Sequence, residues 1–255
     1  MADRILLSVV VITKNEAANI VDCLKSVYDW ADELLVVDDE STDNTRELCR
    51  SFSDKIFVRK MDNEGSHRNW AYAQAKNNWV LSLDADERIT PELQKEVAQV
   101  LQSPKDYNAF AIPRRNYIGN YWVKYCGWYP SAQLRLFKKD KFKYEEVEVH
   151  PRVFLDGKCG VLKSDMIHYS YKGFEDFLGK LNRQTTMEAK KWVSTNRKMS
   201  LGVAIWRTMD RFPRSYIRKK GYKEGFMGFM IAFFASLYQI ISYAKFVEMK
   251  KRKAE

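Results

Sequence analysis

Residues 80–86 read Val-Leu-Ser-Leu-Asp84-Ala85-Asp86, and the interpretation of the whole chain starts from this stretch. Its mostly apolar first half is typical of a buried strand, and two carboxylates follow at the strand's end. Paired carboxylates in that position can hold a hard divalent cation, which can in turn hold a diphosphate. A solvated acidic turn is the alternative, because Asp is common after strands. The rest of the N-terminal half separates these two interpretations.

Strand-like and helix-like segments alternate about four times in the first hundred residues. Apolar runs predict buried strands at 5–12, 33–37 and 79–83, and Thr90-Pro91 predicts the start of a helix. This alternation is typical of an α/β fold with a mostly parallel sheet and helices on both faces. In such sheets ligands bind beyond the carboxyl ends of the strands. Polar clusters follow three of the strands, at 13–16, 38–43 and 84–87, so we expect them to meet at one rim.

A nucleotide is the ligand that these clusters suit best. The base and ribose pocket is expected to be lined by Thr13, Asn15 and Glu16. A hydrogen bond from a nucleobase N–H or a ribose hydroxyl would be accepted by Asp38 or Asp39. One acidic pair is weak evidence for such a site, whereas three clusters at the ends of strands in one sheet are much stronger.

Phosphate binding would depend on a cation and basic side chains. Neither G-x-G-x-x-G nor a Walker sequence follows the first strand, which disfavours Rossmann dehydrogenases and P-loop NTPases. The cation, Mg²⁺ or Mn²⁺, would be bound by Asp84 and Asp86, and the donor would also contact Ala85. Arg68 and Arg135 are candidates for contacts with the diphosphate, although Arg68 could equally be an exposed helix charge.

The general base is expected in the segment that follows the nucleotide-binding half. Residues 145–150 alternate in polarity, so Glu146, Glu148 and His150 would share one face of a strand. One of the two carboxylates is the preferred base, with His150 orienting the acceptor. The alternative for both glutamates is a solvated strand face. His168, between two apolar residues, is interpreted as a hydrogen-bonded core residue.

The C-terminal region combines a long apolar stretch with many bases. Residues 225–244 carry no charge, and about twenty helical residues span roughly 30 Å, enough to cross a bilayer core. Bases lie on both sides of this stretch, at 207–223 and at 250–253, and Pro213 must interrupt any helix there. This pattern favours a helix lying in, or re-entering, an anionic interface over a true span. A core or oligomer helix with solvated flanks is the alternative.

Composition limits the class of protein and its partners. The chain has 255 residues, 45% of them hydrophobic, and a formal net charge of +10, which suits an anionic partner. Its four cysteines are far apart and form no CxxC pair, so we expect reduced thiols in a cytosolic setting. We expect no signal peptide, because the N-terminal apolar run of about eight residues ends at 13–16 and not at a small-residue cleavage site.

Three segments resemble the signature sequences of family 2 glycosyltransferases, and together they are highly specific: Val9–Glu16, Leu35–Asp43 and Trp79–Arg88. Later segments are similar to a subgroup of bacterial lipopolysaccharide-core glucosyltransferases: Gln133–Phe137, Val149-His150 and Ile167–Tyr171. In that subgroup an acidic residue often follows the histidine, whereas this chain has Pro151. The identity of the base is therefore not carried over from the resemblance.

The resemblance implies a GT-A fold over residues 1–172, with the nucleotide-sugar site in 1–104 and the acceptor site in 105–172. Residues 173–255 would form a helical, basic, membrane-associated extension. The implied reaction is an inverting transfer of glucose from UDP-glucose to a lipid-linked saccharide, the lipopolysaccharide inner core. The enzyme would work as a peripheral or monotopic protein at the cytoplasmic face of the bacterial inner membrane.

Two rival functions remain open at this point. A polyprenyl-phosphate glycosyltransferase would use a phosphate oxygen as the nucleophile and would need no strong general base. A protein of another class, binding single-stranded nucleic acid, could use the basic C-terminus and the aromatic loop at 117–129. The pair Asp84 and Asp86 disfavours nucleic acid, because without a metal it would repel a phosphate backbone.

Overall fold

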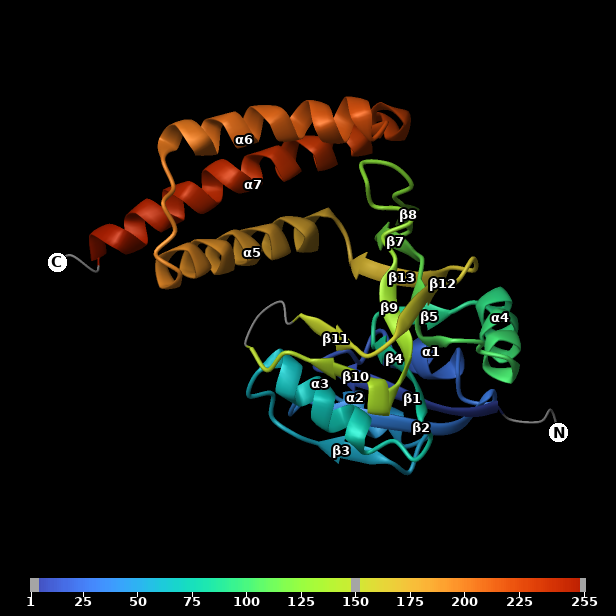
Figure 1. Ribbon diagram of the computed structural model, residues 1–255. Coiled ribbons are helices and arrows are strands. Elements are labelled where there is room, and N and C mark those ends of the chain that lie inside the picture. The colour runs from blue at the N-terminus through green and yellow to red at the C-terminus, as the bar shows by residue number, and fades with distance from the viewer. Residues whose placement is uncertain (1–4, 148–151, 253–255) are drawn as a thin grey trace. The chain divides into compact units, whose positions relative to one another are not determined.

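The computed structural model describes residues 5–147 and 152–252 and divides the chain into two compact units. Unit 1 comprises residues 1–114 and 132–168, and unit 2 comprises residues 115–131 and 169–255. Figure 1 labels the elements of both. The expected domain boundaries at 104 and 172 stay predictions.

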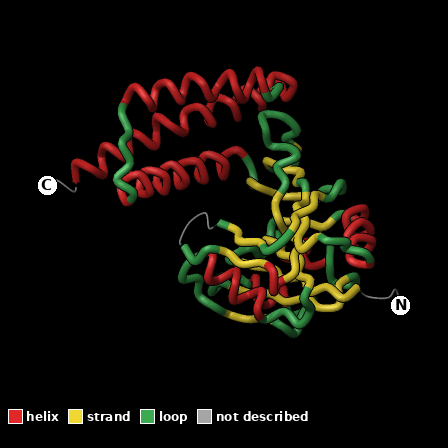
Figure 2. Tube along the Cα trace, viewed as in Figure 1, coloured by secondary structure: helices red, strands yellow, loops and turns green. Residues whose placement is uncertain are grey.

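A seven-stranded mixed sheet forms the centre of unit 1 (Figure 2), in the order β12-β6-β9-β4-β1-β2-β3. The neighbours β4-β1-β2-β3 run parallel, as does the pair β12-β6, whereas β9 is antiparallel to both β4 and β6. The bounds are β1 (Ile5–Thr13), β2 (Ala31–Asp38), β3 (Ile56–Val58), β4 (Trp79–Asp84), β6 (Tyr107–Ile112), β9 (Gln133–Lys138) and β12 (Lys158–Val161).

Both faces of this sheet are covered, which explains the continuous apolar runs of its strands. Leu7, Val9 and Val11 of β1 pack into one core with α1 (Ile20–Lys25), α2 (Thr45–Cys49) and α4 (Pro91–Gln102). The alternate residues Val10 and Ile12 pack into a second core with α3 (Glu64–Ala73). The predicted start of α4 is confirmed, because the Thr90 hydroxyl accepts the Leu93 N–H and Pro91 is the first helical residue.

Short strands complete unit 1. β5 (Glu87–Ile89) pairs with β13 (Met166–Tyr171), and β10 (Phe142–Tyr144), which follows η1 (Lys139–Lys141), pairs with β11 (Val153–Leu155). The expectation of a strand through residues 145–147 is wrong. β11 provides ladder partners only for residues 142–144, so the chain leaves the strand at Glu145. The rest of that expected strand, including Glu148 and His150, lies outside the described residues.

Unit 2 is mainly helical. α5 (Phe174–Ser194) and α6 (Leu201–Pro213) both pack on α7 (Gly225–Arg252), and β7 (Arg114–Ile118) pairs with β8 (Tyr121–Trp122). After Pro213 the helix widens into one π-type turn, η2 (Arg214–Arg218), followed by η3 (Gly221–Glu224). The proline ring clashes with the carbonyl of the preceding helical turn and provides no N–H donor. The change of helix type after Pro213 is therefore the interruption that we expected.

The segment Gly221–Arg252 is the one described helix that is long and apolar enough, by length and composition, to cross a membrane. Only 33% of its most apolar window is buried inside the structure. Its buried side includes the polar residues Ser236, Gln239 and Ser242. α7 therefore buries polar as well as apolar residues and leaves part of its apolar surface exposed, at Phe226, Phe229 and Phe233.

Glu33 of β2 contacts three other segments of unit 1 and is only 5% exposed. Its carboxylate accepts the Ser8 hydroxyl and, at 2.7 Å, the Lys76 N–H, and it pairs with Lys55. Burial alone would raise the pKa of Glu33, but the bonds from Lys55, Ser8 and Lys76 outweigh it and lower that pKa. The charged form of Glu33 is therefore favoured in the folded chain, and this stabilisation is lost as the pH falls through the lowered pKa.

We expect Glu33→Gln to lower the free energy of unfolding at pH 7 by about 1–3 kcal/mol, because buried donors lose a charged acceptor. The loss of stability on acidification should also become shallower below the ordinary glutamate pKa of 4.5. Urea unfolding between pH 7 and pH 3 measures both effects. Asp54→Asn, at an exposed position, is the control. Equal acid sensitivity in Glu33→Gln and the wild type would contradict this account.

Candidate active site

The three predicted polar clusters do meet at one rim of the sheet. Parallel pairing places Thr13 opposite Asp38 and Ile12 opposite Asp84, so β1, β2 and β4 end side by side. The Asp39 N–H continues the ladder by donating to the Thr13 carbonyl over 2.9 Å. The convergence expected from the strand ends is therefore confirmed.

The loop after β1 is braced on the loop after β2. Asn15 adopts a left-handed backbone conformation, which asparagine tolerates better than most residues. Its N–H donates to the Ser41 hydroxyl over 2.8 Å, and its side-chain oxygen accepts the Thr42 N–H at the same distance. The Glu16 N–H donates to the Thr45 hydroxyl over 2.9 Å. These bonds fix the two loops against each other before any ligand arrives.

Asp38 and Asp39 have different surroundings. Asp38 is fully buried, with one oxygen accepting the Ser41 N–H at 2.9 Å and the other without a partner. Asp39 pairs with Lys14 and accepts the Met61 N–H, both at 2.7 Å. Burial would raise the pKa of Asp39, but the bonds from Lys14 and Met61 outweigh it and lower that pKa. Asp39 is thus held as a carboxylate.

A cleft of about 210 Å³ opens at this rim. It is lined by Ile12, Thr13, Lys14, Glu16, Asp39, Met61, Asp84, Ala85 and Asp86. Two of the lining residues each have a buried side-chain oxygen without a hydrogen-bond partner, Thr13 Oγ1 and Asp86 Oδ1. A buried polar atom without a partner costs about 1–3 kcal/mol, so these two oxygens are suited to a polar ligand that enters the cleft.

Asp84 is held between two arginines that the sequence alone had not paired with it. Arg68 from α3 contacts Asp84 Oδ1 at 3.0 Å, and Arg135 from β9 contacts Oδ2. The same Arg135 nitrogen lies 2.7 Å from the fully buried Glu87, which also accepts the Asp84 N–H at 3.0 Å. Burial alone would raise the pKa of Asp84, but Arg135 and Arg68 outweigh it and hold that pKa well below its usual range.

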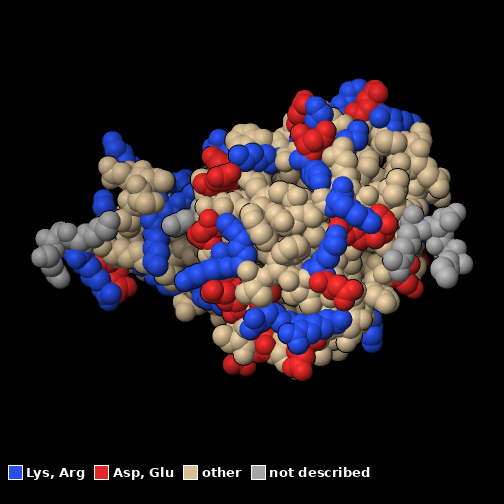
Figure 3. Space-filling view, turned by 90° about the horizontal axis from the view of Figure 1, so that it is seen from below, with Lys and Arg blue, Asp and Glu red and all other residues tan. Residues whose placement is uncertain are grey.

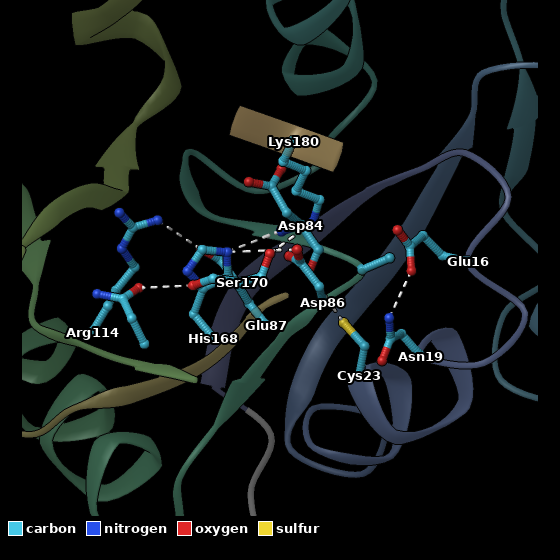
Figure 4. Close-up of polar contacts among 12 residues, drawn as sticks. Glu16, Asn19, Cys23, Asp84, Asp86, Glu87, Arg114, His168, Ser170 and Lys180 are labelled. Atoms are coloured by element: carbon cyan, nitrogen blue, oxygen red, sulfur yellow. Dashed lines mark hydrogen bonds and ion pairs between the residues drawn. The ribbon is translucent and has the colours of Figure 1, made fainter. Parts of the chain in front are cut away.

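Asp86 is oriented differently. Asp86 Oδ2 lies 3.5 Å from Nε2 of His168 on β13, and Oδ1 has no partner (Figure 4). The loop between the two aspartates is held by a further contact, because Arg88 donates to the Ala85 carbonyl over 2.8 Å. The Cys23 thiol points to the Asp84 carbonyl, and burial raises the pKa of that thiol. Asp84 is therefore an anchored residue, whereas Asp86 has one buried oxygen without a hydrogen-bond partner.

These residues fit a divalent cation that takes most of its ligands from the substrate. Among the described residues no group of three or more His, Cys, Asp or Glu could hold a metal alone. Mg²⁺ in nucleotide sites is commonly held by one or two carboxylates together with phosphates and waters. The carboxylate of Asp86, with one oxygen that has no hydrogen-bond partner, matches that requirement, and the imidazole of His168 lies beside it.

The other predicted residues have varied positions. Arg68 and Arg135 are 12% and 7% exposed and are directed at carboxylates, so their contacts with a diphosphate stay a prediction. Glu146 is 53% exposed and pairs with Lys143 at 3.0 Å. As noted, Glu148 and His150 lie outside the described residues. All four cysteines are free thiols, as expected.

Sequence reasoning missed the roles of Glu87 and His168. The two residues lie opposite each other in the antiparallel pair of β5 and β13. Glu87 directly follows the acidic pair in the sequence, and this position could have indicated that it belongs to the site. The position of His168 depends on pairing between strands that are about eighty residues apart, and no local pattern indicates it.

Comparison with known proteins agrees with this geometry. The family model for glycosyl transferase family 2 matches residues 8–167. An uncharacterized glycosyltransferase of Rickettsia typhi is 27% identical over 96% of this chain and 86% of that protein. A lipopolysaccharide core biosynthesis glycosyltransferase of Rhizobium meliloti is 24% identical over 100% of this chain and 96% of that protein.

Among solved structures, glucosyl-3-phosphoglycerate synthase from Mycobacterium tuberculosis, in complex with Mg²⁺ and UDP, is 21% identical. The match covers 45% of each chain with a TM-score of 0.39. The family model, by contrast, covers more than half of the chain and includes all three strand ends that form the cleft. The protein therefore belongs to family 2 of the glycosyltransferases and is an enzyme with the α/β fold called GT-A.

Proposed function

We propose that this enzyme transfers glucose from UDP-glucose to a hydroxyl group of a lipid-linked saccharide of the lipopolysaccharide core, with inversion at the anomeric carbon. The single observation that carries the donor site is the cleft at the ends of β1, β2 and β4, where Asp86 Oδ1 is buried without a partner. The similarity to a lipopolysaccharide core biosynthesis glycosyltransferase over the whole chain supports the acceptor class.

The nucleoside would be bound at the β1 and β2 side of the cleft. Thr13 Oγ1 is an unpartnered acceptor or donor there, and Glu16 lines the same cleft. Asp39 is held as a carboxylate by Lys14, which suits it to accept a hydrogen bond from a nucleobase N–H or a ribose hydroxyl. The braced backbone of Asn15 would keep these groups in position.

The diphosphate would be bound at the β4 side. A divalent cation bound there would neutralise the charge that develops on the departing diphosphate. Asp86 and His168 are the residues that would hold it. Asp84 was also predicted as a ligand, but both of its oxygens already accept from arginines, so we assign it mainly to holding Arg68 and Arg135 in place.

The transfer itself is a single displacement. The acceptor oxygen forms a bond to the anomeric carbon while the bond from that carbon to the diphosphate oxygen breaks. The hydroxyl proton passes to a general base, for which Glu146, Glu148 and His150 remain our candidates. The exposed, ion-paired Glu146 would need to exchange Lys143 for the acceptor hydroxyl to act in this way.

We further propose that unit 2 attaches the enzyme to the anionic cytoplasmic face of the bacterial inner membrane. α6 exposes a stripe of apolar side chains, Leu201, Ile205, Trp206 and Met209, of which Met209 is 70% exposed. On the face shown in Figure 3, Lys and Arg lie beside Asp and Glu, so positive charge is not concentrated there. An amphipathic helix with bases beside its apolar stripe is suited to an anionic interface.

We expect Asp86→Asn to reduce metal-dependent hydrolysis of UDP-glucose about 100-fold or more, because the carboxylate that holds the cation is lost. Mn²⁺ binding in the presence of UDP, measured by calorimetry, should weaken in parallel, and urea unfolding should change little. A panel of nucleotide sugars with Mg²⁺ or Mn²⁺ identifies the donor. Unchanged turnover or Mn²⁺ binding in this variant would refute the metal assignment.

Asp84→Asn is the matched variant and should act mainly on stability. It removes one carboxylate from two buried arginines, which we expect to lower the free energy of unfolding by about 3 kcal/mol. Urea unfolding of the two variants side by side measures the difference. Equal destabilisation by Asp86→Asn would contradict the division of roles between the two aspartates.

Glu146→Gln and Glu148→Gln test the nature of the acceptor. If one carboxylate is the base, its variant should lose about 100-fold or more in transfer to the saccharide while UDP-glucose still binds. Wild-type turnover in both variants and in His150→Ala would favour the polyprenyl-phosphate alternative, since a phosphate oxygen needs no strong base. Transfer from labelled UDP-glucose to each acceptor class measures the outcome.

We expect Met209→Asp to weaken binding to vesicles that contain anionic lipid, because a charge enters the apolar stripe of α6. Co-sedimentation with vesicles measures the loss. Met187→Asp on α5, where the side chain is 45% exposed, is the matched control and should bind as the wild type does. Equal losses in both variants would count against this stripe as the membrane contact.

A further inference from the structure

A second cleft, of about 200 Å³, lies in unit 2 far along the sequence from the donor site. It is lined by Trp206, Arg207, Asp210, Arg211 and Arg214 of the α6–η2 segment and by Gln239 of α7. The three arginines follow one another at spacings of four and three residues, so they lie on one side of the helix. These three guanidinium groups therefore line one cleft and are not scattered over the exposed surface.

Two of the three arginines, Arg207 and Arg211, have neutral partners. Arg207 Nη1 donates to Gln239 Oε1 over 3.4 Å, and the Arg211 guanidinium lies 5.6 Å from the centre of the Tyr238 ring. Neither contact neutralises charge, and each leaves several N–H groups of the guanidinium for another acceptor. Within the lining, the one acidic side chain is Asp210, which pairs with Arg214.

The charge of this lining identifies the chemistry of its ligand. Three guanidinium groups and one carboxylate leave a net charge of about +2 in the cleft. A phosphate monoester carries about −1.5 to −2 at neutral pH and has three acceptor oxygens. A diester, with a single negative charge, would compensate this lining less completely. Arginine is also the residue best suited to bidentate contacts with phosphate oxygens.

The position of the cleft indicates where the phosphate comes from. Trp206 lines the cleft and also belongs to the exposed apolar stripe of α6, with 64% of its surface exposed. Tryptophan is enriched at the level of lipid headgroups, where its ring is amphipathic. A lipid whose chains lie along the stripe would therefore have its headgroup at the arginines.

We propose that this cleft, named here the α6 arginine cleft, binds the phosphate monoester headgroup of a membrane lipid. The proposal rests on the membrane association proposed above and not on the transfer reaction. It gives that association a specific headgroup contact in addition to the general attraction between bases and anionic lipid.

Vesicle binding without any nucleotide sugar tests the proposal, so the result is independent of the donor site. The probes are phosphatidylcholine vesicles with phosphatidic acid, or with enough phosphatidylglycerol to reach the same surface charge. We expect the wild type to bind the phosphatidic acid vesicles about tenfold more tightly. Equal binding to the two kinds of vesicle would overturn the proposal, because only the surface charge would then matter.

Variants show whether the arginine cleft is responsible. Arg207→Ala/Arg211→Ala should abolish the preference for phosphatidic acid, whereas Lys190→Ala/Lys191→Ala, which removes the same charge from exposed positions on α5, should keep it. Arg207→Lys/Arg211→Lys should restore binding but not the full preference, since lysine cannot make bidentate contacts. Loss of the preference in the α5 control as well would overturn the assignment.

A variant that is expected to bind more tightly distinguishes loss of the site from loss of the fold. Asp210→Asn raises the net charge of the cleft, so we expect it to strengthen binding to phosphatidic acid vesicles several-fold. Weaker or unchanged binding in a folded Asp210→Asn protein would contradict the proposal. Circular dichroism melting curves verify that each variant is folded.

Two further arms identify the source of the phosphate. Inorganic phosphate and glycerol phosphate should compete with the vesicles only weakly, since they lack the chains that contact the stripe; strong competition would indicate a soluble phosphate ligand. Tight binding of a single-stranded oligonucleotide that is lost in Arg207→Ala/Arg211→Ala would assign the cleft to nucleic acid and overturn the lipid proposal.

Discussion

The contact between Arg135 and the two carboxylates of Asp84 and Glu87 is the interaction on which the rest of the site depends. It ties β9 to the end of β4 and to β5, while Arg68 adds a tie from α3 to the same Asp84. Charges taken out of water are stable only if each finds its partner, so removing one member leaves the others uncompensated. The network therefore fixes where the loop between Asp84 and Asp86 can lie.

This constraint gives the two aspartates different chemistry. Asp84 is neutralised by arginines and lies in a fixed geometry, whereas Asp86, two residues later, lines the cleft and has one buried oxygen without a hydrogen-bond partner. The proposed cation site would need such an unpartnered group on a rigid support. The same support continues through Arg88, which holds the Ala85 carbonyl between them.

Unit 2 uses charge in the opposite way. In unit 1 the site arginines are buried against carboxylates and carry little free charge, whereas Arg207 and Arg211 face neutral partners and keep theirs. The first arrangement fixes a structure, and the second is suited to an anionic ligand from outside. A positive net charge suits a phosphorylated substrate. The arginines beside the proposed donor site, however, are paired with carboxylates, so the net charge of the chain does not indicate where that site lies.

The sequence by itself determined the parallel strands, both of their covered faces, and the polar groups at the ends of β1, β2 and β4, because apolar periodicity and strand ends are local features. It also led to the correct family. Only the tertiary structure decided that Arg135, Glu87 and His168 join Asp84 and Asp86, since those contacts depend on strands distant in the chain. Likewise, the alternation around Glu146 predicted a strand, but a strand forms only where a partner provides hydrogen bonds.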